Sequence, residues 1–558
     1  LKPPALAPRR HRRRSWPRRA MALARFGAAA WALARGVAAQ RTGTLSSEES
    51  PALTIEACEA GVCQPESTKI TMDMNWRWLH NKDAYNNCLT DAGWDQDLCQ
   101  TPEECSRNCM LEGVDAKGYS DTYMAAATGS ELKLTFPKAP RVYMTETDGN
   151  YKMFKLLNRE FAFDVDLSSL PCGMNAALYF IEMPVDGAKS DLNQAGSKYG
   201  TGYCDAQCPH GKFINDKANV KNWTTHQARN PDGEWIEVGP EGQYGICCAE
   251  MDLLEANREA GAFTAHPCKY PGQKQCQGDE ECGNKDKDNV GWCDKDGCGF
   301  ASYRMGDQKF WGAGDGYAVD TSKPITIVTQ FVTSDQTDTG DLVEIRRLYI
   351  QDGKVIKNSE ASALPSGGDS ITDALCAEAA KTFNATTYGY GELGGLKAMG
   401  QALGRGMALS MSIWDDDFGR MLWLDGEKGR FDDNVTEAGV RRGECPFDFG
   451  TNKDLIDYAN KNGPVEVKFS SIKYGKIGST HPSIGSAYVE KFQAPSDAAP
   501  HVSDNVGRRG APASLAAAAA LCAAVLVAAA ALALASRARE WRRRRGAQLL
   551  PGEECPGS

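Results

Sequence analysis

Hydrophobic and polar positions alternate along many short stretches of this chain. Stretches with a period of two, each bounded by Gly, Pro, Asn or Asp, lie at residues 132–136, 161–167, 177–183, 325–332, 342–350, 407–414 and 465–472. A period of two is typical of strands that bury one face, and the bounding residues favour turns. Helical signals are few, with short candidates at residues 373–382 and 454–461. The pattern therefore predicts an all-β fold, a large antiparallel β-sandwich with long functional loops.

The amino-terminal end differs in composition from the body of the chain. Residues 1–20 are basic and could be untranslated sequence. Residues 21–39 combine Arg25, an apolar Ala- and Leu-rich stretch and a small-residue Val-Ala-Ala motif, which is typical of a signal peptide cleaved near Gln40. We therefore expect the chain to enter the secretory pathway.

The carboxyl-terminal end carries a second apolar segment. Residues 515–535 form an uninterrupted apolar run of about the length that crosses a bilayer. Arginines follow at once, and by the positive-inside rule they place residues 536–558 in the cytoplasm as an Arg-rich tail. Residues 493–514 are predicted to form a juxtamembrane stalk. We expect one C-terminal transmembrane helix and a cell-surface type I membrane protein whose extracellular domain spans residues 40–492, or a secreted protein if the tail is cleaved.

Composition and cysteine usage limit the partners of this domain. The net charge of −10 argues against nucleic acid, because phosphate binding needs a basic surface. Of the 20 cysteines, 18 lie between Cys58 and Cys445, and they form no Cys/His zinc spacing. This usage is typical of disulfides formed in an oxidising, extracellular compartment, and no metal or cofactor is predicted.

One short segment concentrates carboxylates. Glu250, Asp252 and Glu255 lie within six residues, directly after Cys247 and Cys248. Carboxyl groups held this close repel one another, so their pKa values are expected to split into an ionised and a protonated member. That pair is what glycoside hydrolysis needs. The alternative is an amphipathic helix whose acidic face is merely solvated, as in most acidic clusters.

Strand geometry would favour chemistry over the solvated helix. On a strand, Cys248, Glu250 and Asp252 share one face, and Glu255 points away unless a bulge or bend follows Asp252. With that bulge the two glutamates would lie about 5 Å apart, the separation of the retaining mechanism. Disulfides from the two adjacent cysteines would hold the strand on both sides, which favours a positioned site.

Further motifs accompany this segment. Besides Glu-Met-Asp-x-x-Glu-Ala-Asn after a Cys-Cys pair, distinctive segments lie at residues 75–78, 177–180, 198–208, 264–268, 293–298, 411–416, 421–425 and 472–480. Together, and in this order, they resemble glycoside hydrolase family 7, the cellobiohydrolases and endoglucanases. The resemblance spans roughly residues 58–489.

The resemblance implies a curved jelly-roll, concanavalin-like β-sandwich whose long cleft binds a β-1,4-glucan chain such as cellulose. By it, Glu250 is the nucleophile and Glu255 the general acid/base. Asp252 would orient Glu250, and His266 would lie near the reacting sugar. The implied substrate-binding residues are Asn175, Tyr179, Asp205 and Gln207 on the donor side, Asp296 and Arg442 on the leaving-group side, and Trp76, Trp78, Trp414 and Trp423 as stacking platforms. Trp76 and Trp78 are expected to share one face of a strand.

Disulfide pairing carried over by the resemblance uses all 18 cysteines of the body. The implied pairs are Cys58–Cys63, Cys88–Cys109, Cys99–Cys105, Cys172–Cys445, Cys204–Cys248, Cys208–Cys247, Cys268–Cys293, Cys276–Cys282 and Cys298–Cys376. Met110 stands where many fungal members have a further cysteine, and the upstream partner is absent as well.

Loop lengths bear on the mode of cleavage that the resemblance implies. Segments 219–244 and 282–293, which roof the cleft in cellobiohydrolases, are retained and favour an enzyme that releases mainly cellobiose. The connection 136–141 is short, and Asp288 and Gly299 fall where product-site residues often occur. We therefore expect a partly open tunnel, and an endoglucanase of the same family is the alternative.

Two other classes of function fit parts of the sequence. A catalytically silent, membrane-anchored β-glucan-binding protein would share the fold, but the three intact carboxylates argue against it. A calcium-binding ectodomain would use the acidic runs 286–288 and 294–297, which lack the ligand spacing of an EF-hand loop. Sequons at Asn222, Asn384 and Asn434 predict N-glycosylation, and we expect a monomer.

Overall fold

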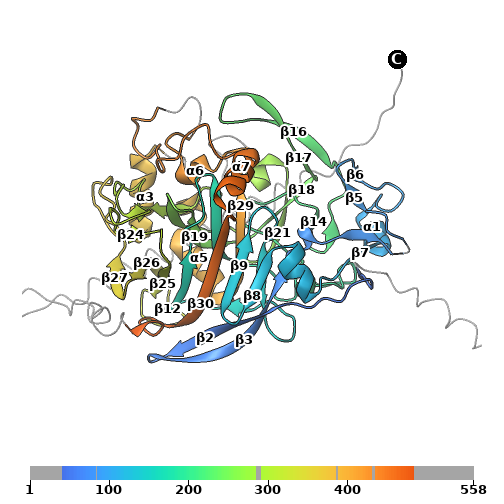
Figure 1. The fold of residues 1–558 in the computed structure, drawn as a ribbon, viewed down its shortest axis with the longest axis horizontal. Helices are drawn as coiled ribbons and strands as arrows, with labels where there is room; N and C mark the ends of the chain where they lie inside the picture. The colour runs from blue at the N-terminus through green and yellow to red at the C-terminus, as the bar shows by residue number, and fades with distance from the viewer. Residues whose placement is uncertain (1–40, 83, 284–290, 385–387, 430–433, 483–558) are drawn as a thin grey trace, which may run out of the picture. The chain divides into compact units, whose positions relative to one another are not determined.

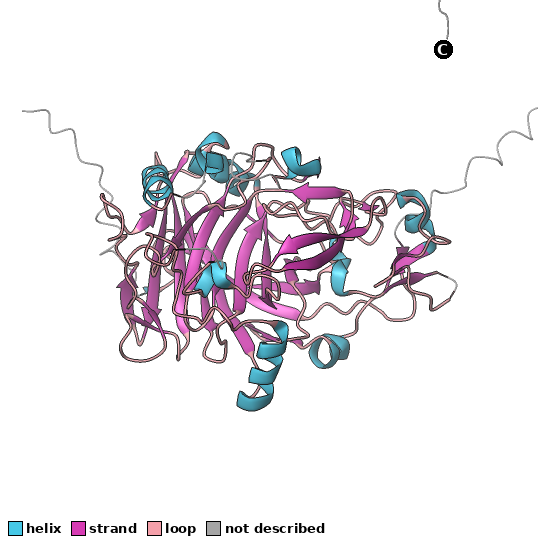
Figure 2. Ribbon diagram, turned by 90° about the horizontal axis from the view of Figure 1, so that it is seen from above, coloured by secondary structure: helices cyan, strands magenta, loops and turns pink. Residues whose placement is uncertain are grey.

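Seventeen strands join in one hydrogen-bonded network that is folded into two layers (Figure 1). The computed structural model describes residues 41–82, 84–283, 291–384, 388–429 and 434–482. All of these residues belong to one unit, Leu1–Phe492. Figure 2 shows its strands side by side through the middle, with the helices outside them.

The first layer is antiparallel and carries the acidic motif on an interior strand. Its strands, in spatial order, are β22 (Cys298–Ala301), β20 (Gly261–His266), β19 (Glu250–Ala256), β13 (Met174–Ile181), β29 (Met407–Asp415), β10 (Val142–Thr145), β3 (Val62–Met72) and β2 (Ala52–Glu59). The short β11 (Met153–Phe154) also pairs with β29.

The second layer covers the inner face of the first. In spatial order it contains β26 (Leu342–Gln351), β25 (Ile325–Thr333), β12 (Arg159–Asp166), β30 (Glu466–Lys476), β9 (Glu131–Thr135) and β8 (Ala125–Thr128). Both β27 (Lys354–Lys357) and β28 (Ser370–Ile371) pair with β26. The layers are joined where β30 runs parallel to β2.

Alternation along the strands separates the core from the functional face. On β13, Ala176, Leu178 and Phe180 pack into the core between the layers, whereas Tyr179 lies in a separate cluster on the other face. Asn175 is an even number of positions from Tyr179 on the same strand, so it lies on the same face as Tyr179. The outer face of the first layer is therefore free to carry polar chemistry.

The predicted elements are found with small shifts of their ends. The seven predicted strands are β9, β12, β13, β25, β26, β29 and β30, and the two helices are α3 (Asp373–Thr382) and α7 (Asn452–Asn462). The all-β sandwich is thus confirmed.

The remaining α-helices are α1 (Pro102–Asn108), α2 (Gly278–Cys282), α4 (Tyr388–Glu392), α5 (Gly395–Arg405) and α6 (Leu422–Asp425). The remaining strands are β1 (Arg41–Thr42), β4 (Leu79–Asn81), β5 (Leu89–Thr90), β6 (Gly93–Trp94), β7 (Cys109–Leu111), β14 (Phe213–Ile214), β15 (Lys217–Ala218), β16 (Thr224–Arg229), β17 (Trp235–Glu241), β18 (Tyr244–Cys247), β21 (Lys274–Gln277), β23 (Trp311–Gly312) and β24 (Val319–Asp320).

The helix α5 was not predicted, because its glycines lower helix propensity. It forms because Leu396, Met399 and Leu403 are buried in the main core. A Cβ at Gly400 would lie 2.6 Å from the Cβ of Leu342, so glycine allows the helix to approach β26 closely. Tertiary packing thus overrides the local preference.

The prediction that Trp76 and Trp78 share a strand face is wrong. Met74–Trp76 form a 3-10 helix, and β4 begins after Trp78. The side chain of Asp73 accepts a hydrogen bond of 2.7 Å from the backbone N–H of Asn75, which favours a turn over an extended chain.

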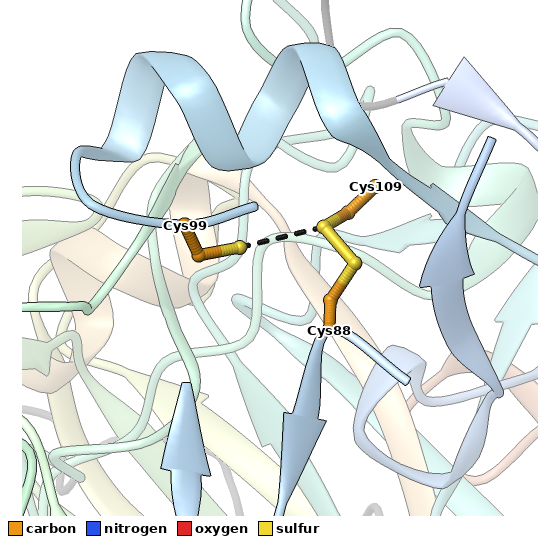
Figure 3. Close-up of side chains that lie close together, drawn as sticks. All are labelled: Cys88, Cys99 and Cys109. Carbon is orange, nitrogen blue, oxygen red and sulfur yellow. Dashed lines mark hydrogen bonds between the residues drawn. A yellow bond between two sulfur atoms is a disulfide. The ribbon is translucent and has the colours of Figure 1, made fainter. Parts of the chain in front are cut away.

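Nine disulfides join the same pairs that the resemblance implies. Figure 3 shows a group of three of these cysteines, in which the sulfur of Cys99 lies 3.4 Å from the Cys109 sulfur of the Cys88–Cys109 disulfide. Cys99 is itself bonded to Cys105. Because these sulfurs are all in disulfides, the group has no thiolate with which to hold a metal ion.

Several predictions concern segments outside the described residues. These segments are the basic run 1–20, the signal peptide 21–39, the stalk 493–514, the transmembrane helix 515–535 and the tail 536–558. Within the described part of the chain, no helix has the length and apolar character needed to cross a membrane. The asparagines of the three sequons are exposed, and their glycosylation stays a prediction.

Candidate active site

The acidic motif forms the strand β19, and this strand is bulged. In its pairing with β20, one extra residue of β19 lies between Asp252 and Glu255. The register shifts at the same place against β13. Leu253 and Leu254 are both buried in the core, so the extra residue turns Glu255 back to the face that carries Glu250 and Asp252. The predicted bulge is confirmed.

The adjacent cysteines hold Glu250 in a different way from the one predicted. Cys247 ends β18 and Cys248 precedes β19, so they do not alternate along the catalytic strand. Their disulfides run to one segment, Cys204–Cys208, rather than to two sides of the strand. This fixed segment lies beside Glu250, and the backbone N–H of Ala206 donates a hydrogen bond of 3.0 Å to the Glu250 Oε2 atom.

Asp252 forms an ion pair with His266. The Nε2 atom of His266 lies 2.9 Å from the Asp252 carboxylate, and its Nδ1 atom lies 2.7 Å from the carbonyl oxygen of Asp294. Both ring nitrogens thus face acceptors, which fits an imidazolium. Burial alone would lower the pKa of His266, but the hydrogen bond to Asp252 and the charge of Asp252 hold that pKa well above its ordinary value.

Glu255 lies in a site that favours its protonated form. Burial, together with the negative charge of Asp252, raises the pKa of Glu255 to about 8. The side-chain N–H of Asn175 donates to Glu255 Oε1 at 3.2 Å, and the Asn175 carbonyl accepts from the backbone N–H of Ala256 at 3.0 Å. The second bond fixes the orientation of the amide, so its N–H points at Glu255. At neutral pH this carboxyl group can donate a proton.

The pKa of Glu250 is set by burial and by the charges around it. Burial raises its pKa well above the ordinary value, and the charges of Asp252 and Asp205 act in the same direction. The positive charge of His266 and the N–H of Ala206 act against this rise. The protonation of Glu250 therefore depends on the charges of these neighbours. The state with Glu250 ionised and Glu255 protonated has both a nucleophile and an acid.

Three of the residues predicted for the donor side, Tyr179, Asp205 and Gln207, belong to one hydrogen-bonded group. Asp205 accepts from the Tyr203 hydroxyl and, at 2.8 Å, from the backbone N–H of Gln207. The hydroxyls of Tyr179 and Tyr203 lie 3.3 Å apart. Arg141 stacks on Tyr203, with its guanidinium 3.2 Å from the ring centroid. A cavity of about 130 Å³ opens here, lined by Met74, Asn75, Arg141, Gly202, Tyr203, Asp205, Pro209, Gly211, Phe213, Asn215 and Ile246.

Two residues of this group were missed by sequence reasoning. Tyr203 belongs to the motif at residues 198–208, so its position there was a usable signal. Arg141 lies in a short connection without any distinctive pattern, and only the fold brings it to Tyr203.

Arg304 interacts with Asp296 and Arg442, the two residues predicted to bind the leaving-group side. Burial and the positive charge of Arg442 lower the pKa of Arg304 to about 9, and the charge of Asp296 opposes this shift. Arg304 therefore interacts electrostatically with both Asp296 and Arg442. A lone arginine in a loop gives no sequence signal, which is why Arg304 was missed.

Three of the four predicted platforms are exposed, and the fourth, Trp78, is half-buried. Trp76, Trp414 and Trp423 are exposed, and the rings of Trp414 and Trp423 stack with centroids 6.2 Å apart. Trp78 stacks on Tyr85, an exposed ring that sequence reasoning missed, with centroids 5.9 Å apart. Exposed aromatic planes suit the apolar faces of sugar rings.

A hairpin in the predicted roof segment reaches a distant part of the chain. Strands β16 and β17 form this hairpin, the long green arm at the top of Figure 1. Asp232 at its tip forms an ion pair with Arg420, 188 positions away, through two contacts, one of them 3.2 Å long. Arg420 precedes α6, the helix that carries Trp423. The tip therefore contacts the segment of a predicted sugar platform.

This fold and the buried carboxyl groups on one face of β19 define a glycoside hydrolase with a β-sandwich scaffold. The family model for glycosyl hydrolase family 7 matches residues 42–481, and the chain belongs to this family. As a member of it, the protein is a cellulase of glycoside hydrolase family 7.

Solved structures of both cleavage modes resemble this one. A family 7 cellobiohydrolase from Daphnia pulex is 45% identical, with 79% of this chain and 100% of that chain covered and a TM-score of 0.73. A cellobiohydrolase from Melanocarpus albomyces complexed with cellotetraose is 36% identical over 79% and 99%, with a TM-score of 0.69. The native endocellulase EGI of Humicola insolens is 35% identical over 79% and 100%, with a TM-score of 0.65.

Proposed function

We propose that this protein hydrolyses the β-1,4-glucan chains of cellulose with retention of configuration and releases mainly cellobiose. The observation that carries the proposal is the bulge of β19, because it brings Glu250 and Glu255 to one face of one strand. The separation of about 5 Å expected for retention stays a prediction. A carboxyl pair on one rigid strand suits direct attack better than attack by an intervening water.

The first step joins the sugar to the enzyme. The ionised Glu250 attacks the anomeric carbon, while Glu255 gives its proton to the glycosidic oxygen as the carbon–oxygen bond breaks. The N–H of Ala206 holds one oxygen of Glu250 in place during the attack. The leaving chain departs as a neutral alcohol, and Glu255 becomes a carboxylate.

The second step returns the enzyme to its first state. Glu255 now takes a proton from water, whose oxygen attacks the anomeric carbon and displaces Glu250. Two inversions at one carbon give retention. Asp252, in its ion pair with His266, lies on the same face and would orient the Glu250 carboxylate.

Contacts around the carboxyl groups support a long glucan chain as substrate. The exposed tryptophans would stack on successive glucose rings, and the polar group around Asp205 would bind hydroxyls on the donor side. Asp296, Arg442 and Arg304 would bind the leaving portion.

The contact between the hairpin tip and Arg420 supports exo cleavage. A hairpin fastened at its tip would roof the cleft as a tunnel, and a chain that threads a tunnel is cut from its end. The short connection 136–141 between β9 and β10 favours the second candidate, an endoglucanase, because a short loop there would leave part of the cleft uncovered.

The nine disulfides indicate an extracellular or secreted enzyme. We further propose that residues 515–535 anchor it in the cell membrane. Fractionation of expressing cells tests this: the protein should stay with membranes after a high-salt wash, and release by salt alone would contradict the anchor.

Product analysis of the purified protein tests the catalytic proposal. With cellulose or soluble cello-oligosaccharides, proton NMR should show the β-anomer forming first, and chromatography should show mainly cellobiose. A first-formed α-anomer would overturn the retaining mechanism. A broad range of long oligosaccharides would favour the endoglucanase over the cellobiohydrolase as the function of this protein.

A further inference from the structure

Arg347 crosses the core of the sandwich to reach the catalytic strand. It belongs to β26 in the second layer, and it is only 3% exposed. Its Nη2 atom donates a hydrogen bond of 2.5 Å to the carbonyl oxygen of Leu253, the extra residue in the bulge of β19. Its guanidinium also lies over the ring of Phe263, 4.2 Å from the centroid. Phe263 is the residue of β20 that lies opposite the bulge.

These contacts satisfy the buried guanidinium only in part, since its Nε atom has no hydrogen-bond partner among the described residues. Burial is unfavourable for a guanidinium and lowers the pKa of Arg347 to about 10. Among the described residues, no carboxylate forms an ion pair with Arg347. Its hydrogen bond goes instead to the carbonyl of Leu253, which the bulge displaces from the ladder with β13. A buried carbonyl without a donor is costly, so the bulge needs such a partner.

We propose that Arg347 is a positioning residue that fixes the bulge at Leu253 and thereby holds Glu255 in place for proton transfer. The inference rests on the proposed function, in which Glu255 is the general acid/base. Glu250 precedes the bulge and is held separately by Ala206 and its disulfide-linked segment. Loss of Arg347 should therefore disturb Glu255 more than Glu250.

Leaving-group dependence tests this selectivity in the full-length protein. Arg347→Met keeps most of the side-chain volume and removes the donor. With phenyl β-cellobioside, whose leaving group needs a proton, kcat/KM should fall about 10- to 100-fold. With 2,4-dinitrophenyl β-cellobioside, which leaves unaided, kcat/KM should change less than about threefold. Added azide should raise kcat of Arg347→Met with 2,4-dinitrophenyl β-cellobioside, because azide attacks the glycosyl-enzyme without the help of a base.

A second variant and a control separate positioning from stability. Arg347→Lys keeps the charge and one donor, and it should show a smaller loss with the same dependence on leaving group. Phe469→Leu, a buried change on β30, should lower the melting temperature with no such dependence. If Arg347→Met lost kcat/KM equally on both substrates, or kept the wild-type kinetics, the proposed role of Arg347 would be overturned. A wild-type protein inactive on both substrates would instead overturn the proposed function.

Discussion

Breaking the ion pair between Asp232 and Arg420 should open the hairpin β16–β17 and shift the products from cellobiose towards internal cuts. The two side chains are 39% and 13% exposed, so solvent screens the pair in part. A partly exposed pair with two contacts is expected to contribute about 0.5–1 kcal/mol. Since 1.4 kcal/mol corresponds to a factor of ten, the ratio of closed to open hairpin should fall about two- to fivefold.

Asp232→Asn is the cleaner perturbation, because Arg420 also donates a hydrogen bond of 3.2 Å to the carbonyl of Phe447. The assay compares cellobiose released from crystalline cellulose with the loss of viscosity of carboxymethyl cellulose. The ratio of the two rates should fall about two- to fivefold in the variant. In the wild type, 1 M salt should shift the ratio in the same direction, because salt screens exposed charges.

Two further variants test the specificity of this effect. The charge-swapped Asp232→Arg/Arg420→Asp protein should recover part of the wild-type ratio. Lys453→Gln removes an exposed ion pair with Asp457 on α7 and should leave the ratio unchanged. If Asp232→Asn has the wild-type ratio at low salt, the tip contact does not close the cleft and the reasoning fails.

Four other outcomes are expected. Glu250→Gln should reduce turnover at least about 10³-fold while cellobiose still binds in titration calorimetry, and appreciable residual activity would exclude Glu250 as nucleophile. Because Glu255 must be protonated and its pKa is about 8, kcat/KM should fall as the pH rises through about 8, and protonation of Glu250 should give a separate loss on the acid side. Asp252→Asn removes a negative charge that raises the pKa of Glu255, so the alkaline limb should move to lower pH; a move to higher pH would contradict the electrostatic argument. Replacing the Cys172–Cys445 disulfide by serines should lower the free energy of unfolding by about 2–5 kcal/mol in denaturant titration, and an unchanged midpoint would contradict its role.

Much of the sandwich was predictable because the information is local. Alternation along β13 or β25 identifies a strand and its buried face without reference to any other segment. The helix α5 escaped prediction because its stability comes from contact with the core and not from its own residues. The turn at Met74–Trp76 escaped for a similar reason: a capping contact from Asp73 decided a segment whose spacing also fits a strand.

The candidate site also has one part that the sequence predicted and another that only the tertiary structure determined. The spacing of Glu250, Asp252 and Glu255, with the cysteines before them, was enough to indicate paired carboxyl chemistry and to require a bulge. Only the tertiary structure decided what holds that bulge, since Arg347 comes from the opposite layer. Only the tertiary structure also shows that Arg304 interacts with Asp296 and Arg442 and that the hairpin tip reaches Arg420. These contacts join residues far apart in the chain, and periodicity carries no information about such pairs.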